Sequence, residues 1–245
     1  MKHYSVMLNE IIDSLNIKSD GIYVDATLGY AGMSSKILEK LNNNGLLIGI
    51  DQDKEARDYS DKVLREIGNN YKIVDANFSE LKEKLTELGI SQIDGIIFDL
   101  GFSSPQIDDD KRGFSFMRDA DLDMRMNLDD KLTAKVVVNT YSVENLTKCF
   151  YEYGEEKLSK VIANKIADYR KNKEIVRTLE LVEIIKSAVG ANYFFKNHPE
   201  RKIFQAIRIE VNNELGVLKK AIPDAIELLK SGGRMSVISF HSLED

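Results

Sequence analysis

Apolar runs alternate with amphipathic segments over residues 21–100. Four runs are apolar on both faces, which is typical of strands buried in a parallel sheet. They span residues 21–26, 45–51, 71–76 and 93–100. The three segments between them have helical periodicity and are long enough to connect parallel strands. They span residues 34–41, 54–67 and 79–88. Successive β-α-β units of this kind predict an α/β fold with a doubly wound parallel sheet and helices on both faces.

The pattern changes after Leu100. Residues 101–130 are rich in Gly, Ser, Asp, Phe and Met without a clear period, which predicts an ordered loop region. Helical patterns follow, and residues 228–240 then predict the end of a helix, a glycine turn and a fifth strand that returns the chain to the sheet. We therefore expect a discontinuous sheet domain, residues 1–130 and 199–245, interrupted by a helical insertion at 131–198.

The composition is that of an ordinary globular protein, with 43% hydrophobic and 30% charged residues in a chain of 245. No apolar run has the length that crosses a bilayer. Glu10 and Asp13 interrupt the N-terminal region where a secretory signal would be continuously apolar. We therefore expect a cytoplasmic protein with no membrane partner.

The net charge of −6 argues against a surface covered in phosphate-binding groups, but the charges are unevenly distributed. Residues 143–202 contain 12 Lys and Arg against 9 Asp and Glu, a net charge of +3. Two interpretations stay open for this basic segment. The first is a set of solvated helix faces, which charge alone favours, and the second is contact with an anionic polymer.

A candidate ligand site lies at the predicted carboxyl ends of the strands, where open α/β sheets bind their ligands. Gly29 and Gly32 follow the first strand, and Asp51 ends the second, a spacing at which an acid commonly binds an adenosine ribose. This pattern fits dinucleotides and S-adenosylmethionine equally well.

Asp25 separates these two ligand classes. A carboxylate beside the glycine turn repels a pyrophosphate and attracts the ammonium and sulfonium groups of S-adenosylmethionine. The alternative is that Asp25 caps the following turn with its own side chain. Asp75 and Asp99 end two further strands, but without histidines or closely spaced carboxylates these acids predict no metal site.

Several long motifs, in order along nearly the whole chain, resemble the MraW/RsmH family. They include "HYSVMLNE", "DLGFSSPQIDDDKRGFSFMRDADLDMRM", "YGEEKLSKVIA", "FQAIRIEVNNELGVL" and "GGRMSVISFHSLED". The resemblance implies a class I, Rossmann-like methyltransferase that uses S-adenosyl-L-methionine. It also implies the reaction, methylation of N4 of a cytidine in the decoding region of small-subunit (16S) ribosomal RNA.

The resemblance assigns cofactor contacts residue by residue. The cofactor turn is assigned to Ala31, Gly32 and Met33. The acid that binds the ribose is Asp51, and the aromatic residue beside the adenine is Phe78. Further cofactor contacts are assigned to Asp99 and Gln106. Taken singly, Phe78 could be a core aromatic and Gln106 a turn residue. We predict Asp99 as the catalytic residue, because methylating a delocalised amine needs a hydrogen-bond acceptor that localises its lone pair.

Cations and aromatic rings are interleaved after the fourth strand, as recognition of an unstacked base requires. The candidate substrate-RNA residues are Arg112, Phe114, Phe116, Arg118 and Arg125. The alternative is a loop anchored by phenylalanines and held by salt-bridged arginines. The resemblance favours RNA contact both here and by the helical insertion at 131–198. We therefore expect ribosomal RNA or the small ribosomal subunit as partner, with a monomer and a homodimer both open.

The sequence departs from the family at several positions. Tyr30, Ala31, Gly32 and Met33 stand where the family has Arg-Gly-Gly-His, so Met33 offers no imidazole hydrogen bond. The family also continues past the block that ends here at Asp245, so we expect the C-terminal part of the sheet to be incomplete. One alternative function is therefore a catalytically impaired S-adenosylmethionine-binding protein. Another, an NAD-dependent oxidoreductase, is disfavoured by Asp25 and the missing third glycine.

Overall fold

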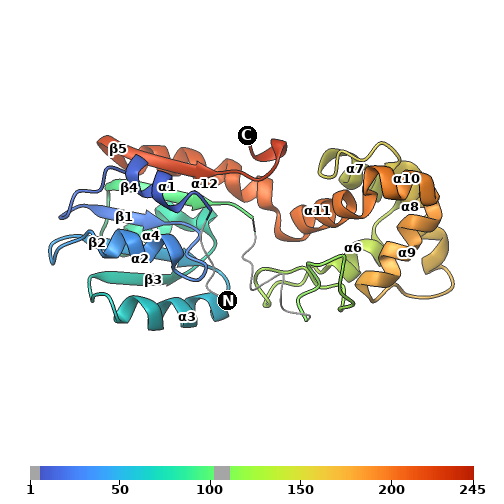
Figure 1. The fold of residues 1–245 in the computed structure, drawn as a ribbon, viewed down its shortest axis with the longest axis horizontal. Helices are drawn as coiled ribbons and strands as arrows, with labels where there is room; N and C mark the ends of the chain where they lie inside the picture. The colour runs from blue at the N-terminus through green and yellow to red at the C-terminus, as the bar shows by residue number, and fades with distance from the viewer. Residues whose placement is uncertain (1–5, 102–110) are drawn as a thin grey trace. The chain divides into compact units, whose positions relative to one another are not determined.

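The computed structural model describes residues 6–101 and 111–245, and the chain divides into two compact units (Figure 1). The first, called the sheet unit, comprises Met1–Ser103 and Leu215–Asp245. The second, called the helical unit, comprises Ser104–Glu214. Each unit has its own hydrophobic core.

The sheet unit contains five parallel strands in the order β3-β2-β1-β4-β5. The strands are β1 (Ile22–Asp25), β2 (Leu46–Asp51), β3 (Tyr71–Asp75), β4 (Ile93–Asp99) and β5 (Leu229–Ile238). The chain winds outward from β1 to β3 and then crosses to β4 and β5 on the other side. This order confirms the predicted doubly wound fold and places the switch point between β1 and β4.

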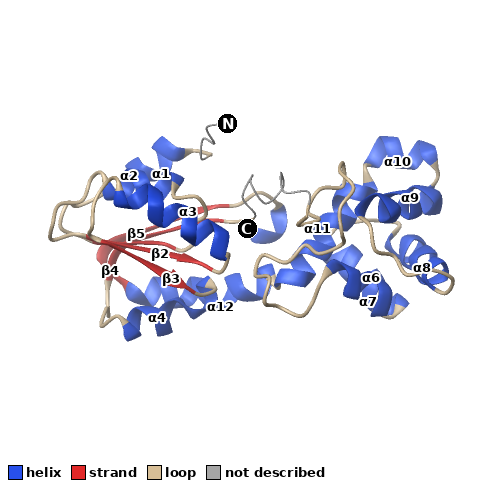
Figure 2. Cartoon of the chain, turned by 90° about the horizontal axis from the view of Figure 1, so that it is seen from below, coloured by secondary structure: helices blue, strands red, loops and turns tan. Residues whose placement is uncertain are grey.

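Helices cover both faces of this sheet (Figure 2). The helical elements of the unit are α1 (Leu8–Ser14), α2 (Gly32–Leu38), α3 (Lys54–Arg65), η1 (Phe78–Glu80), α4 (Leu81–Glu87), α12 (Glu214–Leu228) and η2 (Ser242–Glu244). Side chains alternate along each strand, so neighbours enter different cores. Tyr23 and Leu47 join the core beneath α1, α2 and α3, whereas Val24 and Ile48 join the core with α4 and α12. This two-sided burial is the reason the strands read as continuously apolar.

The glycine turn predicted before the fifth strand lies inside β5. Leu229 pairs with Ile93, but the next pair joins Arg234 to Gly95, so residues 230–233 form an irregularity in the ladder. Gly232 adopts a φ of 79° within it, a conformation that glycine takes at no steric cost.

The helical unit has its own set of helices around a large apolar cluster. They are α6 (Ala134–Thr140), α7 (Val143–Glu152), α8 (Ser159–Arg170), α9 (Thr178–Val189), α10 (Ala191–Asn197) and α11 (Pro199–Asn212). Thr133 and Ser142 cap α6 and α7 by accepting hydrogen bonds from backbone N–H groups. Among the described residues, no helix combines the length and apolar character needed to cross a membrane.

The structural units differ from the predicted domains at both boundaries. Before α6, Phe114, Leu122 and Met124 are buried in the core of the helical unit, so this loop region belongs there and not to the sheet unit. After α10, α11 buries Ile203 and Ile207 in the same core. The sequence pattern showed a helix with one apolar face but not which core that face enters.

Candidate functional site

The loop after β1 is folded against the middle of α3 and the end of β2. Gly29 adopts a φ of 48°, its N–H donates to the Asp51 carboxylate at 2.8 Å, and its carbonyl accepts from Ser60 Oγ at 2.7 Å. The N–H of Leu28 donates to the carbonyl of Ile50 at 3.0 Å. These contacts fix the turn at the carboxyl edge of the sheet, where the sequence predicted a ligand.

Asp25 ends β1 and is almost completely buried. Its carboxylate accepts hydrogen bonds from Ser34 Oγ at 2.7 Å and from the Thr27 N–H at 3.2 Å. Burial raises the pKa of Asp25 to about 7, against the lowering effect of the hydrogen bonds from Ser34 and Thr27 and with smaller contributions from the negative charges of Asp99 and Asp51. The hydrogen bond from the Thr27 N–H shows that Asp25 caps the turn that follows it, which is the alternative role expected from the sequence. The same geometry also concentrates negative charge at this edge.

Asp51 ends β2, where its two carboxylate oxygens organise two turns. Oδ2 accepts from the Gly29 N–H and Oδ1 accepts from the Asp53 N–H at 2.8 Å. Burial raises the pKa of Asp51 to about 6, against the lowering effect of these two hydrogen bonds. Each oxygen has a second lone pair, so the carboxylate has the acceptors that a ribose diol needs.

Asp75, directly opposite Asp51 in the β2–β3 register, has a different environment. It is exposed and forms an ion pair of 2.6 Å with Arg57, whose guanidinium also donates to the Asp51 carbonyl. Asp75 is thus neutralised by a neighbouring cation. Of the four acids that end described strands, we therefore assign Asp25, Asp51 and Asp99 to the acidic site.

Asp99 ends β4, beside β1 at the switch point of the sheet. Its N–H donates to Thr27 Oγ1 at 2.7 Å, which ties the end of β4 to the loop after β1. The predicted catalytic carboxyl therefore belongs to the same edge as Asp25, whose charge it influences.

Phe78 is half-buried in η1, and its ring meets Phe98 edge to face with centroids 5.7 Å apart. Asn77 caps η1 in a reciprocal capping box with Glu80, which fixes the orientation of this turn. Phe78 packs against the core but is not enclosed by it. It thus has the core contacts expected of a structural aromatic and retains an accessible part that suits an adenine contact.

The three residues of the predicted cofactor turn differ in environment. Ala31 is fully buried with a φ of 61°, and Met33 is 5% exposed within the core beneath α1, α2 and α3. Gly32, the first residue of α2, is exposed. The side chains of Ala31 and Met33 point into protein, so any cofactor contact at these positions comes from backbone groups. Gln106, the other predicted contact, lies outside the described residues.

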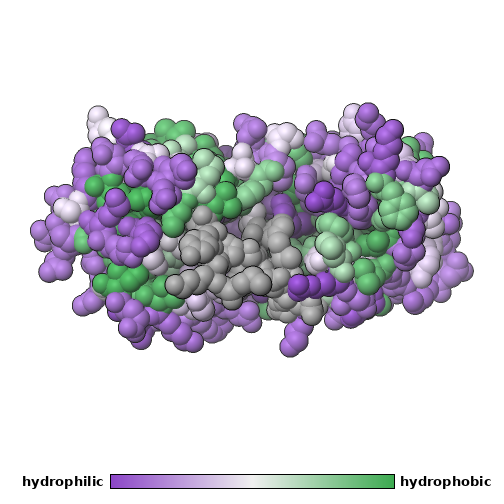
Figure 3. All heavy atoms as spheres, viewed as in Figure 1, coloured by the Kyte–Doolittle hydropathy of each residue, from purple (hydrophilic) through white to green (hydrophobic). Residues whose placement is uncertain are grey.

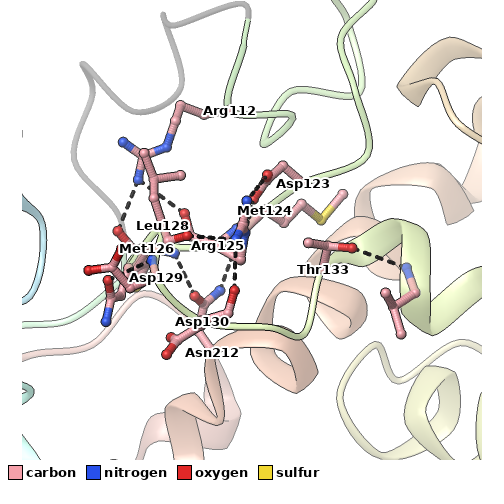
Figure 4. Close-up of polar contacts among 12 residues, drawn as sticks. Arg112, Asp123, Met124, Arg125, Met126, Leu128, Asp129, Asp130, Thr133 and Asn212 are labelled. Carbon is pink, nitrogen blue, oxygen red and sulfur yellow. Dashed lines mark hydrogen bonds and ion pairs between the residues drawn. The ribbon is translucent and has the colours of Figure 1, made fainter.

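The predicted RNA-binding residues of the helical unit are largely engaged within their own loop (Figure 4). Arg125 donates to both carboxylate oxygens of Asp123 at 2.7 and 2.8 Å and to the carbonyls of Leu128 and Asp130. Arg112 is buried and donates to the carbonyls of Arg125 and Met126, both at 3.0 Å.

The two aromatic candidates of this loop pack into the hydrophobic core of the helical unit. Phe114 is buried, and Phe116 meets Phe204 edge to face at 6.0 Å. Arg118, by contrast, is exposed. The interpretation as a loop anchored by phenylalanines and by internally bonded arginines, with Arg125 in a salt bridge, thus describes Arg112, Phe114, Phe116 and Arg125. A role in RNA contact stays a prediction for all five.

Three supporting residues were not singled out from the sequence. Ser34 and Thr27 hold Asp25 and Asp99, and Asn212 of α11 binds the loop by accepting from the Met126 N–H and donating to the Met124 carbonyl. Small polar residues in a helix or a turn carry no spacing signal, so only tertiary structure identifies these partners.

The residues of the acidic edge fit S-adenosylmethionine and do not fit a pyrophosphate. Burial raises the pKa values of Asp25 and Asp51, with smaller contributions from the charges of Asp99 and Asp51 at Asp25 and of Asp53 at Asp51. A ligand with cationic groups lowers this electrostatic cost, whereas a phosphate increases it. The chemistry of these acceptors therefore agrees with the ligand class predicted from the sequence.

The family to which the chain is matched agrees with this assignment. Residues 1–245, the whole chain, match the family described as the MraW methylase family. One similar solved structure is a candidate rRNA methylase from Clostridium thermocellum, 17% identical with a TM-score of 0.36, covering 41% of this chain and 54% of that one. Another is PKMT2 from Rickettsia typhi, 10% identical with a TM-score of 0.32, covering 91% of this chain and 44% of that one. The matched region spans about half the length of each.

Proposed function

Since this chain belongs to the MraW methylase family, we propose that it methylates N4 of a cytidine in the decoding region of small-subunit (16S) ribosomal RNA, with S-adenosylmethionine as methyl donor. Family membership and the Rossmann-like sheet support a methyltransferase. The observation that carries the cofactor assignment is the acidic edge formed by Asp25, Asp51 and Asp99 at the ends of three adjacent strands.

The cofactor would be held by residues at this edge. Asp51 would accept hydrogen bonds from the ribose hydroxyls, and Phe78 would pack beside the adenine. The negative charge of Asp25 would favour the cationic methionine end without direct contact, since its carboxylate already binds Ser34 and Thr27. When bound, S-adenosylmethionine supplies an electrophilic methyl group on a sulfonium.

Asp99 would act on the cytosine. The exocyclic amine shares its lone pair with the ring, and a carboxylate that accepts one N4–H localises that pair for attack. N4 would gain the methyl group, the cofactor would leave as a thioether, and the proton lost by N4 would pass to the Asp99 carboxylate and from there to water. Because the amine becomes acidic as it acquires positive charge, Asp99 needs no raised basicity for this role. Thr27 fixes the backbone of Asp99 and is a positioning residue.

The test is methyl transfer from radiolabelled S-adenosylmethionine to unmodified 16S RNA and, separately, to small subunits assembled from it. Nuclease digestion and mass spectrometry then identify the modified nucleoside. N4-methylcytidine in either substrate supports the proposal, and the better substrate identifies the partner. Methylation of another atom, or none despite calorimetric binding of the cofactor, overturns it; the second result instead favours a catalytically impaired cofactor-binding protein.

A further inference from the structure

An aromatic side chain is exposed at the end of β5, next to the predicted catalytic edge. Phe240 is 57% exposed and lies two residues beyond the last residue of the strand. The motif that contains it, "SFHSLED", has no role in the function proposed so far.

Strand pairing brings Phe240 close to Asp99. In the β4–β5 register Asp99 is opposite Ile238, and the N–H of Leu100 donates to the Ile238 carbonyl at 3.1 Å. The ring then lies against the backbone of Gly101, where an added Cβ would be 3.8 Å from Phe240 Cδ2. Gly101 is two residues after Asp99, a displacement of roughly 6–7 Å along an extended chain.

The backbone beneath the exposed ring is held in place. The N–H of Phe240 donates to Glu244 Oε2 at 2.8 Å, and Glu244 Oε1 lies 3.3 Å from His241 Nε2. Ser239 Oγ donates to the Asp245 carboxylate at 2.8 Å. An exposed aromatic on an anchored turn loses little conformational entropy when another flat group covers it.

Single exposed apolar residues are normal on protein surfaces, and in the view of Figure 3 the described surface is mainly hydrophilic with scattered hydrophobic groups. Phe240 differs from such a residue in its position beside Asp99. An enzyme that modifies a base must take it out of the stack, and it commonly holds the base on an aromatic face. The exposed ring and the carboxyl together provide a face for the pyrimidine and an acceptor for its amine.

We propose that Phe240 is the stacking surface for the target cytosine, which it orients with N4 toward Asp99. This inference rests on the proposed function, because it takes a cytidine in RNA as the substrate. Phe240 is in this view a substrate-binding residue, and it makes no contact with the cofactor.

Photo-crosslinking tests the contact without requiring turnover. An RNA transcript of the small-subunit sequence with 5-iodocytidine in place of cytidine is bound to the full chain and irradiated, and tryptic peptides that carry nucleotide are sequenced. The proposal expects a crosslink at Phe240 in the peptide that begins at Met235. Crosslinks confined to other peptides, or the absence of any crosslink in this one, overturn it.

Kinetics of three variants provide an independent readout. Phe240→Leu keeps apolar volume but removes the stacking face, and Phe240→Trp restores that face. Val237→Ala is the control, because Val237 is an exposed apolar residue within β5, with 40% of its surface accessible. Loss of one stacked base predicts a decrease in kcat/KM for RNA between about 5-fold and 150-fold in Phe240→Leu. Phe240→Trp and Val237→Ala should stay within about 3-fold of wild type, and calorimetric cofactor binding should be unchanged in all three.

The two proposals fail in different ways. If wild-type protein does not form N4-methylcytidine, the proposed function falls, and the crosslink still decides whether Phe240 contacts a cytosine. If wild type is active and Phe240→Leu equals Val237→Ala in kcat/KM, the stacking proposal falls alone.

Discussion

Ser34 Oγ donates a hydrogen bond of 2.7 Å to the carboxylate of Asp25, and both side chains are buried. This contact joins the last residue of β1 to the first turn of α2, on the two sides of the predicted cofactor turn. Because burial places the pKa of Asp25 at about 7, the protonation state of the site changes within the physiological range of pH.

Replacing Asp25 by Asn should flatten the dependence of stability on pH. The pKa of Asp25 is higher in the folded chain than its ordinary value of 3.8, so its contribution is fully present below about pH 4 and is lost as pH rises through 7. At about 1.4 kcal/mol per pKa unit, the loss is of the order of 4 kcal/mol. Urea denaturation of both proteins from pH 4 to pH 8 measures it. If the free energy of unfolding changed with pH equally steeply in the wild type and in Asp25→Asn, Asp25 would not be the group that causes the pH dependence.

Cofactor affinity should change with pH in the opposite direction. A cationic ligand favours ionised Asp25, so binding of S-adenosylmethionine should tighten by up to about 10-fold from pH 6 to pH 8 as the carboxyl loses its proton. Calorimetric titration in buffers of different ionisation enthalpy also measures the released proton. In Asp25→Asn the pH dependence should be largely lost, and a pH-independent affinity in the wild type would contradict the electrostatic role.

Two aspartates in direct register allow a matched test of the ribose site. Asp51→Asn replaces a charged acceptor of two backbone N–H groups and should weaken cofactor binding by about 10-fold to 100-fold. Asp75→Asn changes the same atoms on the neighbouring strand, where the side chain is exposed and paired with Arg57. It should leave the affinity within about 2-fold. Calorimetric titration of both variants with S-adenosylmethionine measures this difference. An equal loss of cofactor affinity in the two variants would indicate a general effect of negative charge at this edge of the sheet.

The sequence predicted the sheet and its acidic edge because both depend on local patterns. Buried parallel strands read as apolar runs, and Asp25, Asp51 and Asp99 stand where those runs end. The side-chain environments could not be predicted, because they depend on tertiary packing. Nothing local shows that Arg125 binds Asp123 in its own loop, or that α11 joins the helical core.

Met33 gives a test of one departure from the family. Its side chain is buried in the core beneath α1, α2 and α3, so Met33→His places an imidazole among apolar groups. We expect a loss of about 1–3 kcal/mol in the free energy of unfolding. Met33→Leu, a volume-conserving control, should cost less than about 1.5 kcal/mol. Urea denaturation measures both, and a stable His variant with tighter cofactor binding would show that this position faces the ligand.

Arg125 and Arg118 separate a structural role from RNA contact in the loop of the helical unit. Arg125→Ala removes the hydrogen bonds to Asp123 and to two carbonyls, and charged hydrogen bonds of this kind contribute about 1.5–3 kcal/mol. Its thermal stability should therefore fall. Arg118 is exposed, and interactions of exposed charged side chains contribute little, so Arg118→Ala should change stability by less than about 1 kcal/mol.

RNA affinity is expected to show the opposite pattern: Arg118→Ala should lose RNA affinity without losing stability, whereas Arg125→Ala should mainly lose stability. If Arg118 contacts a phosphate, Arg118→Ala weakens RNA binding and reduces its salt dependence by about one ion, while the fold is unchanged. Fluorescence anisotropy with a labelled RNA at several salt concentrations measures both quantities. Should Arg125→Ala instead retain wild-type stability and lose RNA affinity, its guanidinium would have to leave Asp123 to bind RNA, and the loop would rearrange on binding its substrate.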